Sequence, residues 1–226
     1  PTPERVKYDI FDRVNRGGTR LTNQEMRNAR YKGHSTVMLK DLAASSVFLN
    51  ATGRGISSKR MKDQYVILRS IAFYLLKKKQ HEVLEQNGEA IEYKSDIDDF
   101  LAKTMIFLNE KASKELLEDC KNTFYRAMDN CYNVLGRDAF RFDSESGNRR
   151  PINMPLFEVL MYVFSDNKLM ENVDYMKKEV ENFKREFDHQ QMFSGNVDST
   201  INLNDRYDLA EELIKQISDA IKTNNK

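Results

Sequence analysis

Apolar residues recur at intervals of three and four positions along most of this chain, a spacing typical of amphipathic helices. The spacing predicts about eight or nine helices, at approximately 6–14, 22–31, 35–47, 58–79, 95–108, 113–135, 155–164, 166–187 and 204–222. Polar loops are expected at 50–58, 86–94 and 190–202, and an irregular segment anchored by Phe140 and Phe142 is expected at 138–151. No linker rich in Pro or Gly divides the chain. We therefore expect an all-α fold, with a single irregular helical-bundle domain over residues 1–226.

The clearest helix start signal lies at Thr22. Thr22 is a favoured N-cap residue, and Glu25 three positions later completes the capping-box pattern. Gly33 is expected to end this helix, and Gly136 to end the long helix at 113–135. The expected caps of later helices are Ser35, Ser57 or Ser58, Ser95, and Asp166 or Asn167.

The composition excludes several classes of protein. Hydrophobic residues make up 40% of the chain and aromatic residues 10%, which is enough for a core and excludes wholesale disorder. The longest apolar runs, 71–76 and 159–164, are far shorter than the roughly 18–20 residues that cross a bilayer. No secretion signal opens the chain, so we expect a cytoplasmic location and no membrane partner. Because the chain begins with Pro1 and not with Met, we expect it to be part of a longer protein.

Cys120 and Cys131 are the two cysteines of the chain. Eleven positions apart on one helix, they would lie roughly 16 Å from each other, which is too far for a disulfide. We expect both to be reduced, buried thiols.

The charges are divided unevenly along the chain. The net charge is +1, but residues 1–80 hold 17 basic and 6 acidic residues, whereas residues 81–226 hold 19 basic and 29 acidic residues. Such asymmetry indicates a nucleic-acid, membrane or internal docking surface. We expect a basic part that borders DNA and an acidic helical part that acts as a scaffold. Docking of the basic part onto the acidic part, or onto a subdomain outside this chain, stays open as an alternative.

The candidate DNA-binding residues are Arg54, Lys59, Arg60 and Lys62. Arg69 and the lysines at 77–79 are expected on the same face of the following helix, away from an apolar stripe that includes Met61, Tyr65 and Leu68. Gly53 and Gly55 in the preceding loop allow a close approach of the backbone to a ligand. We expect contacts with phosphates and no sequence-specific readout of bases. The alternative is a solvated helix face.

The motifs that carry enzymatic chemistry are missing from the sequence. It contains no G-x-x-x-x-G-K-[ST] loop, no C-x-x-C pair and no H-E-x-x-H sequence. The histidines, His34, His81 and His189, are too far apart to form a metal-binding motif. Asp96, Asp98 and Asp99 are expected to cap a helix and to form its solvated first turn. We therefore expect no catalytic residue, metal or cofactor in this chain.

The strongest constellation lies at 11–29, where a helix, a turn at Gly17 and Gly18, and the capped helix at Thr22 follow one another. Backbone N–H groups at such a turn, with a helix dipole behind them, can hold an anion. Arg16 and Arg20 add guanidinium groups, which suit phosphate. The alternative is a tight corner between two helices, in which the glycines only supply turn geometry.

The stretch Ile10–Ala29 resembles the signature of the GmrSD-type restriction endonuclease family, iF-x-x-x-N-x-G-G-x-x-L-t-x-x-E-l-R-n-a. The N-terminal domain of that family is related to the ParB/sulfiredoxin fold. Further segments that resemble the family are 60–73, 135–141, 153–158 and 199–214, which includes Arg206, so the resemblance covers essentially the whole chain. Asn15, Gly17, Gly18, Leu21 and Glu25 match the motif, and the resemblance implies a supporting role for them at a nucleotide site. The candidate nucleotide- or phosphate-binding residues are thus Asn15, Arg16, Gly17, Gly18, Arg20 and Glu25.

The resemblance implies bacterial anti-phage defence by nucleotide-stimulated restriction of modified DNA. In the family, a D-G-Q-Q-R motif lies upstream of the signature, and many relatives carry a C-terminal HNH-like nuclease; this sequence has neither. It therefore resembles the downstream, helical part of a larger α+β domain, whose NTP and divalent metal would bind in the full-length protein. The expected partners are DNA and the missing ParB-like subdomain. Self-association, and a non-enzymatic α-helical module for protein–protein interaction, stay open as alternatives.

Overall fold

The computed structural model describes residues 20–78, 85–86, 89–144, 147–190 and 195–224, and over these residues it confirms the all-α prediction. The described α-helices are α2 Asn23–Arg30, α3 His34–Ala44, α4 Ser46–Ala51, α5 Lys62–Lys77, α6 Ile97–Glu110, α7 Lys114–Leu135, α8 Met154–Val163, α9 Val173–Gln190 and α10 Thr200–Asn224. The described 3-10 turns are η1 Lys59–Met61, η2 Gly136–Asp138 and η3 Asn167–Glu171. A short antiparallel hairpin pairs β1 Glu85–Gln86 with β2 Glu89–Ala90. No helix in the described ranges combines the length and apolar character needed to cross a membrane.

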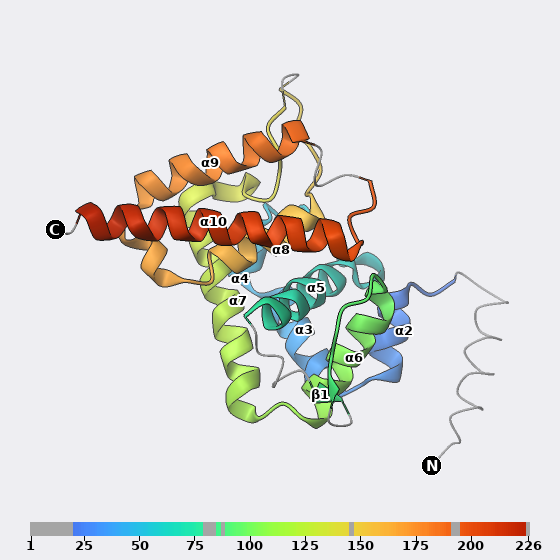
Figure 1. Cartoon of the computed structure of the whole chain (residues 1–226). Coiled ribbons are helices and arrows are strands. Elements are labelled where there is room, and N and C mark those ends of the chain that lie inside the picture. The colour runs from blue at the N-terminus through green and yellow to red at the C-terminus, as the bar shows by residue number, and fades with distance from the viewer. Residues whose placement is uncertain (1–19, 79–84, 87–88, 145–146, 191–194, 225–226) are drawn as a thin grey trace, which may run out of the picture.

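Helix α5 lies at the centre of the molecule, where α3, α6 and α8 pack against it (Figure 1). From Val66 to Leu76 every residue of α5 is buried. The predicted single apolar stripe was therefore too narrow. The run is apolar around nearly its whole circumference, and a helix of that kind is stable only when it is covered on all sides.

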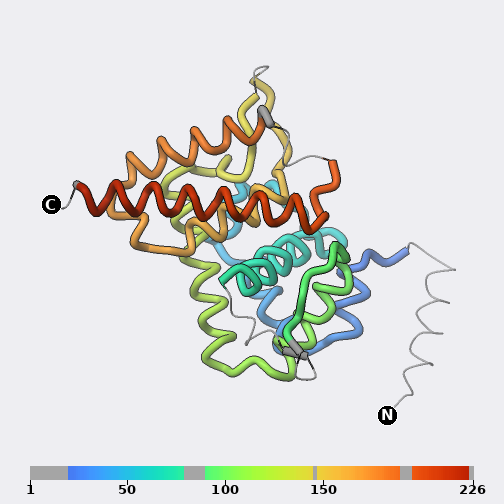
Figure 2. The backbone as a smooth tube through the Cα atoms, viewed as in Figure 1, coloured from blue at the N-terminus to red at the C-terminus, as the bar shows by residue number. Residues whose placement is uncertain are grey.

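Most of the remaining helices extend this core on the side of α5 opposite α2. Helix α10 lies over α8, α9 packs beside α10 and against α7, and the long helix α7 borders α4 and α8 (Figures 1 and 2). The buried apolar side chains form one cluster that runs from Met38 to Ile221. Phe140 and Phe142 are buried within it, as predicted for the anchors of the irregular segment.

Cys120 and Cys131 are buried free thiols, as predicted. Burial raises the pKa of Cys120 to about 12 and that of Cys131 well above its ordinary value. Both are therefore protonated and unreactive at neutral pH.

Several predicted helix boundaries were wrong where a local cap interrupts the apolar spacing. The helix predicted at 35–47 divides at Ser45, whose extended backbone ends α3 and whose hydroxyl accepts from Phe48 N to start α4. The predicted cap Ser35 lies inside α3, which Gly33 precedes. The helix predicted at 166–187 also divides, because Asp166 caps η3 and α9 begins only at Val173.

Other differences concern loops. The segment 86–94, predicted to be a polar surface loop, includes β2 and the buried side chains of Ile91 and Tyr93. Helix α10 begins at Thr200, four residues before the predicted start. The helix predicted at 6–14 lies outside the described residues.

A buried ion-pair network joins α5, α8 and α10. Glu158 of α8 is fully buried, and its carboxylate oxygens pair with Arg69 Nε and, at 3.6 Å, with Arg206 Nη2. Arg69 Nη2 also donates to Asp198 Oδ1 at 2.7 Å, and Arg206 Nη1 donates to the Val197 carbonyl at 2.7 Å. Burial opposes the charge of Arg69, but Glu158 and Asp198 outweigh it and raise the pKa of that guanidinium.

The predicted basic face of α5 is consequently smaller than expected. Arg69, predicted to lie on it, is 2% exposed and belongs to the core network. Lys77 Nζ donates to Asn204 Oδ1 of α10 at 2.7 Å, and Lys78 Nζ lies 4.5 Å from the ring centroid of Tyr162 in α8. These three cations hold helices together.

We expect Glu158→Gln to lower the free energy of unfolding by about 3–5 kcal/mol, because it leaves Arg69 and Arg206 buried without the shared carboxylate. Urea unfolding followed by circular dichroism measures this. The matched control is Glu118→Gln, since Glu118 is exposed and pairs with Lys121 at the surface of α7. Its cost should stay below about 1 kcal/mol. Equal losses in the two variants would contradict the assignment of Glu158 as a central contact.

Candidate nucleic-acid interface

The capping box at Thr22 is present and builds the start of α2. Thr22 Oγ1 accepts from Glu25 N at 3.2 Å, and Glu25 Oε2 accepts from Thr22 N at 2.6 Å. This reciprocal pair satisfies two N–H groups that a helix start leaves without partners. The backbone N–H of Thr22 is the main reason that the pKa of Glu25 is lowered, and Arg60 lowers it further.

Arg60 connects this helix start to η1. Its guanidinium donates to the Arg20 carbonyl, and its Nε lies 3.5 Å from Glu25 Oε2. The Thr22 hydroxyl in turn donates to the Arg60 carbonyl at 3.1 Å. Two groups of residues that the sequence placed in separate candidate sites, Arg20 and Glu25 on one hand and Lys59, Arg60 and Lys62 on the other, therefore lie on one surface.

Arg60 and Met61 occupy the left-handed backbone region, with φ of 57° and 56°. Each such non-glycine residue costs about 1–2 kcal/mol. These residues explain why α5 begins at Lys62 and not at Ser58 as predicted, since a left-handed pair cannot belong to an α-helix. The contacts from Arg20, Thr22 and Glu25 hold the strained turn in place.

A pocket of about 580 Å³ lies beside this turn, between α2, η1 and the starts of α5 and α6. Tyr65, Ile97 and Met154 form its apolar lining, and the charged residues at its wall are Arg27, Lys59, Arg60, Lys62 and Asp98.

The cations around this pocket differ in their availability. Arg27 is 5% exposed and bound to Asp98, with Nη1 and Oδ1 2.6 Å apart. Arg60 is half-exposed although it is paired with Glu25. Lys59 and Lys62 are exposed, and neither forms an ion pair with any residue that the structure describes. We call Arg20, Lys59, Arg60 and Lys62 the η1 basic surface.

Arg54 is not part of this surface. It is exposed in the loop 52–58, with φ of 55°, and does not line the pocket beside η1. The close approach predicted at Gly53 and Gly55 was to a ligand, but the groups that approach these glycines belong to this chain. A Cβ atom at Gly53 would collide with the guanidinium of Arg149, and one at Gly55 with that of Arg141.

The other predicted residues divide into two groups. Asn15, Arg16, Gly17 and Gly18 lie outside the described residues, as does His81. Asp96 caps α6, and not Ser95 as predicted. Asp98, predicted to be part of a solvated first turn, pairs with the buried Arg27, whereas Asp99 pairs with Lys103 at the surface. Within the described part of the chain, no three His, Cys, Asp or Glu side chains gather as a metal site would require.

A second basic site was missed at the sequence level. It lies in the irregular segment, where four arginines fall within 14 residues: Arg137, Arg141, Arg149 and Arg150. This density of arginines is the sequence signal that could have indicated the site.

Comparisons of the chain with protein-family models, curated proteins and solved structures find no match. The resemblance to the GmrSD-type family therefore stays a prediction.

We expect Thr22→Ala to destabilise the protein by about 1 kcal/mol, because α2 loses its cap. The variant should also loosen η1, so the Met61 amide, which donates to the Ser58 carbonyl at 3.1 Å, should exchange its hydrogen faster. Ser45→Ala, which removes the cap of α4, is the control and should leave Met61 exchange unchanged. Unchanged exchange in both variants would show that Thr22 does not hold the turn.

The contribution of Glu25 to stability should depend on pH. Its folded-state pKa is below the ordinary value of 4.5, so the ionised form is the stabilising one. The difference in unfolding free energy between the wild type and Glu25→Ala should be constant above that value. It should shrink as the pH falls through the folded-state pKa. Urea unfolding from pH 7 to pH 3 measures this, and a difference independent of pH would refute it.

Proposed function

We propose that this chain is the helical part of a bacterial GmrSD-like restriction or defence protein, and that its η1 basic surface contacts the phosphate backbone of DNA. The observation that carries the DNA contact is the exposed pair Lys59 and Lys62, without ion-pair partners among the described residues, beside the half-exposed Arg60. Lysines of this kind attract phosphates and release counterions when they bind. The amides of Asn23 and Gln24, which line the pocket, are bonded to Asp98, Asn28 and Arg27, so we infer binding that is independent of sequence.

The contacts of Arg60 support a link between this surface and the signature. Arg60 binds the Arg20 carbonyl and Glu25, and both residues belong to the stretch that resembles the family signature. A nucleotide-binding ParB-like subdomain that engages the signature would therefore sit next to the DNA surface. Catalysis, with its NTP and divalent metal, belongs to that subdomain and to a nuclease in the full-length cytoplasmic protein. A D-G-Q-Q-R sequence ahead of Pro1 in the full gene product would support the family assignment, and its absence there would count against it.

DNA binding should weaken steeply with salt. Fluorescence anisotropy with a labelled duplex should give a linear plot of log affinity against log salt concentration, to which each neutralised phosphate contributes a slope of about −0.9. Lys59→Glu/Lys62→Glu should thus weaken binding and flatten the slope by about 2. Lys111→Glu/Lys114→Glu is the matched control, since these lysines are also exposed and three positions apart.

The control variant should bind like the wild type. Absence of binding at low salt would refute the DNA contact. Wild-type affinity in Lys59→Glu/Lys62→Glu would place DNA elsewhere and favour the alternative, a non-enzymatic module for protein–protein interaction.

A further inference from the structure

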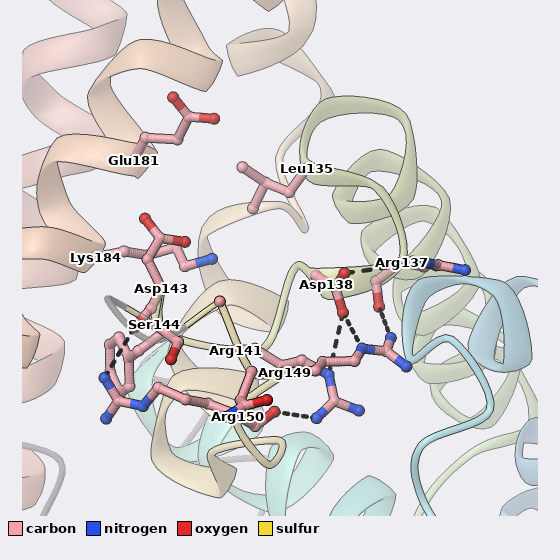
Figure 3. Close-up of a pocket in the computed structure, with 13 residues that line it drawn as sticks. Leu135, Arg137, Asp138, Arg141, Asp143, Ser144, Arg149, Arg150, Glu181 and Lys184 are labelled. Atoms are coloured by element: carbon pink, nitrogen blue, oxygen red, sulfur yellow. Dashed lines mark hydrogen bonds and ion pairs between the residues drawn. The ribbon is translucent and has the colours of Figure 1, made fainter.

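A second charged pocket lies far along the chain from the η1 basic surface. It has a volume of about 370 Å³ and lies between α9 and the segment that follows α7 (Figure 3). Its basic lining residues are Arg137, Arg141, Arg149, Arg150 and Lys184, and its acidic ones are Asp138, Asp143 and Glu181. Among the lining residues that the structure describes, basic residues outnumber carboxylates.

Three guanidinium groups share one carboxylate on one side of this pocket. Asp138 Oδ1 lies 2.5 Å from Arg149 Nε and 3.2 Å from Arg141 Nε, and Asp138 Oδ2 lies 3.9 Å from Arg137 Nε. A single carboxylate cannot neutralise three cations. Arg150 differs, because it forms a two-pronged pair with Asp188 of α9.

Lys184 faces these arginines from α9. Its side chain is more than nine-tenths buried, yet its ammonium forms no hydrogen bond or ion pair with any residue in the described ranges. Figure 3 shows this ammonium directed from α9 into the space between the helix and the arginines. Asp143, Glu181 and Asp138 act on this ammonium electrostatically, but none forms an ion pair with it, so it can bind an anion that enters the pocket.

The electrostatics agree with the geometry. Burial lowers the pKa of Lys184, although Asp143 and Glu181 act in the other direction. Burial also lowers the pKa of Arg141, and the neighbouring Arg149 lowers it further. The cations of this pocket thus lose solvation and repel one another, and an anion in the pocket would offset both effects.

We propose that this pocket binds a sugar phosphate, with the phosphoryl group between Lys184, Arg141 and Arg149. Arg141 and Arg149 each donate to a backbone carbonyl and pair with Asp138, so their remaining N–H groups are the donors for phosphate oxygens, and the Lys184 ammonium adds a compact charge. Asp143 and Glu181 line the same pocket and form no ion pair with a described residue, so their carboxylates are available to accept from sugar hydroxyls. The volume is in the range of small-molecule sites. This site is independent of the η1 basic surface and of the DNA contact proposed there.

Isothermal titration calorimetry on the full chain at low salt tests this, with ribose 5-phosphate, inorganic phosphate, ribose and AMP as probes. Ribose 5-phosphate should bind more tightly than inorganic phosphate, and ribose should not bind. Tight binding of AMP as well would identify a nucleotide as the source of the sugar phosphate, whereas its exclusion would identify a free sugar phosphate. Absence of ribose 5-phosphate binding at millimolar concentration would overturn the proposal, and so would equal affinity for inorganic phosphate.

Two variants locate the site. Lys184→Met and Arg149→Gln should each weaken ribose 5-phosphate binding by roughly tenfold or more, as expected when one charged hydrogen bond is removed. Arg185→Gln is the control, since Arg185 is the next residue on α9, is exposed and contacts Asn182. A similar loss in Arg185→Gln would overturn the assignment.

Two further measurements test whether a loss of ribose 5-phosphate binding reflects a loss of folding or a link to the DNA surface. Lys184→Met should unfold at a temperature no lower than the wild type, because it removes a buried charge without an ion pair. If Lys184→Met fails to fold, the effect of Arg149→Gln on ribose 5-phosphate binding tests the site instead. Lys59→Glu/Lys62→Glu should bind ribose 5-phosphate normally, so a failure of the DNA proposal leaves this one standing; a loss of ribose 5-phosphate binding in that variant would overturn the independence of the two sites.

Discussion

The fold depends on the buried carboxylate of Glu158. A fully buried carboxylate is tolerated only with opposite charges close to it. Arg69 of α5 donates to Glu158, and Arg206 of α10 lies within ion-pair distance, at 3.6 Å. The three helices that carry these residues are therefore fixed relative to one another by geometry as well as by apolar packing. Arg69 extends the constraint to Asp198, in the segment that leads into α10. The sides of α5 that this network leaves free are covered by α3 and α6.

The two basic sites lie at different places relative to the helices that Glu158 joins. The η1 basic surface lies where α5 begins, and the left-handed Arg60 and Met61 separate its exposed lysines from the buried helix that follows. The second pocket is formed by the irregular segment after α7 and by α9. In one site the free charge is exposed, which suits a large polyanion. In the other, Lys184 and Arg141 are buried at the pocket wall, which suits a small ligand that enters the pocket.

The helices were largely predictable from the sequence, because apolar spacing and caps such as Thr22 are local signals. Boundaries were missed where a short polar residue, such as Ser45, ends one helix and starts the next within an unbroken apolar pattern. Arg69 was misplaced because its partners lie 89 and 129 positions away, and no local pattern reveals them. The same holds for the sites. The sequence grouped Lys59, Arg60 and Lys62 with Arg54 and placed Arg20 in another site. The contacts of Arg60 with Arg20 and Glu25, which join them, depend on the packing of α2 against η1. In the sequence, Lys184 is indistinguishable from the other polar residues of α9. Only the fold shows that arginines of the segment after α7 lie opposite it.

The loop 52–58 has a practical consequence for anyone who modifies this protein. Gly55 is exposed and Gly53 is partly exposed, so both look like suitable positions for a fluorescent label, an affinity tag or an inserted domain. Their missing side chains are occupied by the guanidinium groups of Arg149 and Arg141, so a bulky group there would displace the wall of the second pocket. The turn between α6 and α7, with Lys111 and Lys114 exposed, is the better attachment point, because a probe placed there reports on the protein without altering either basic site.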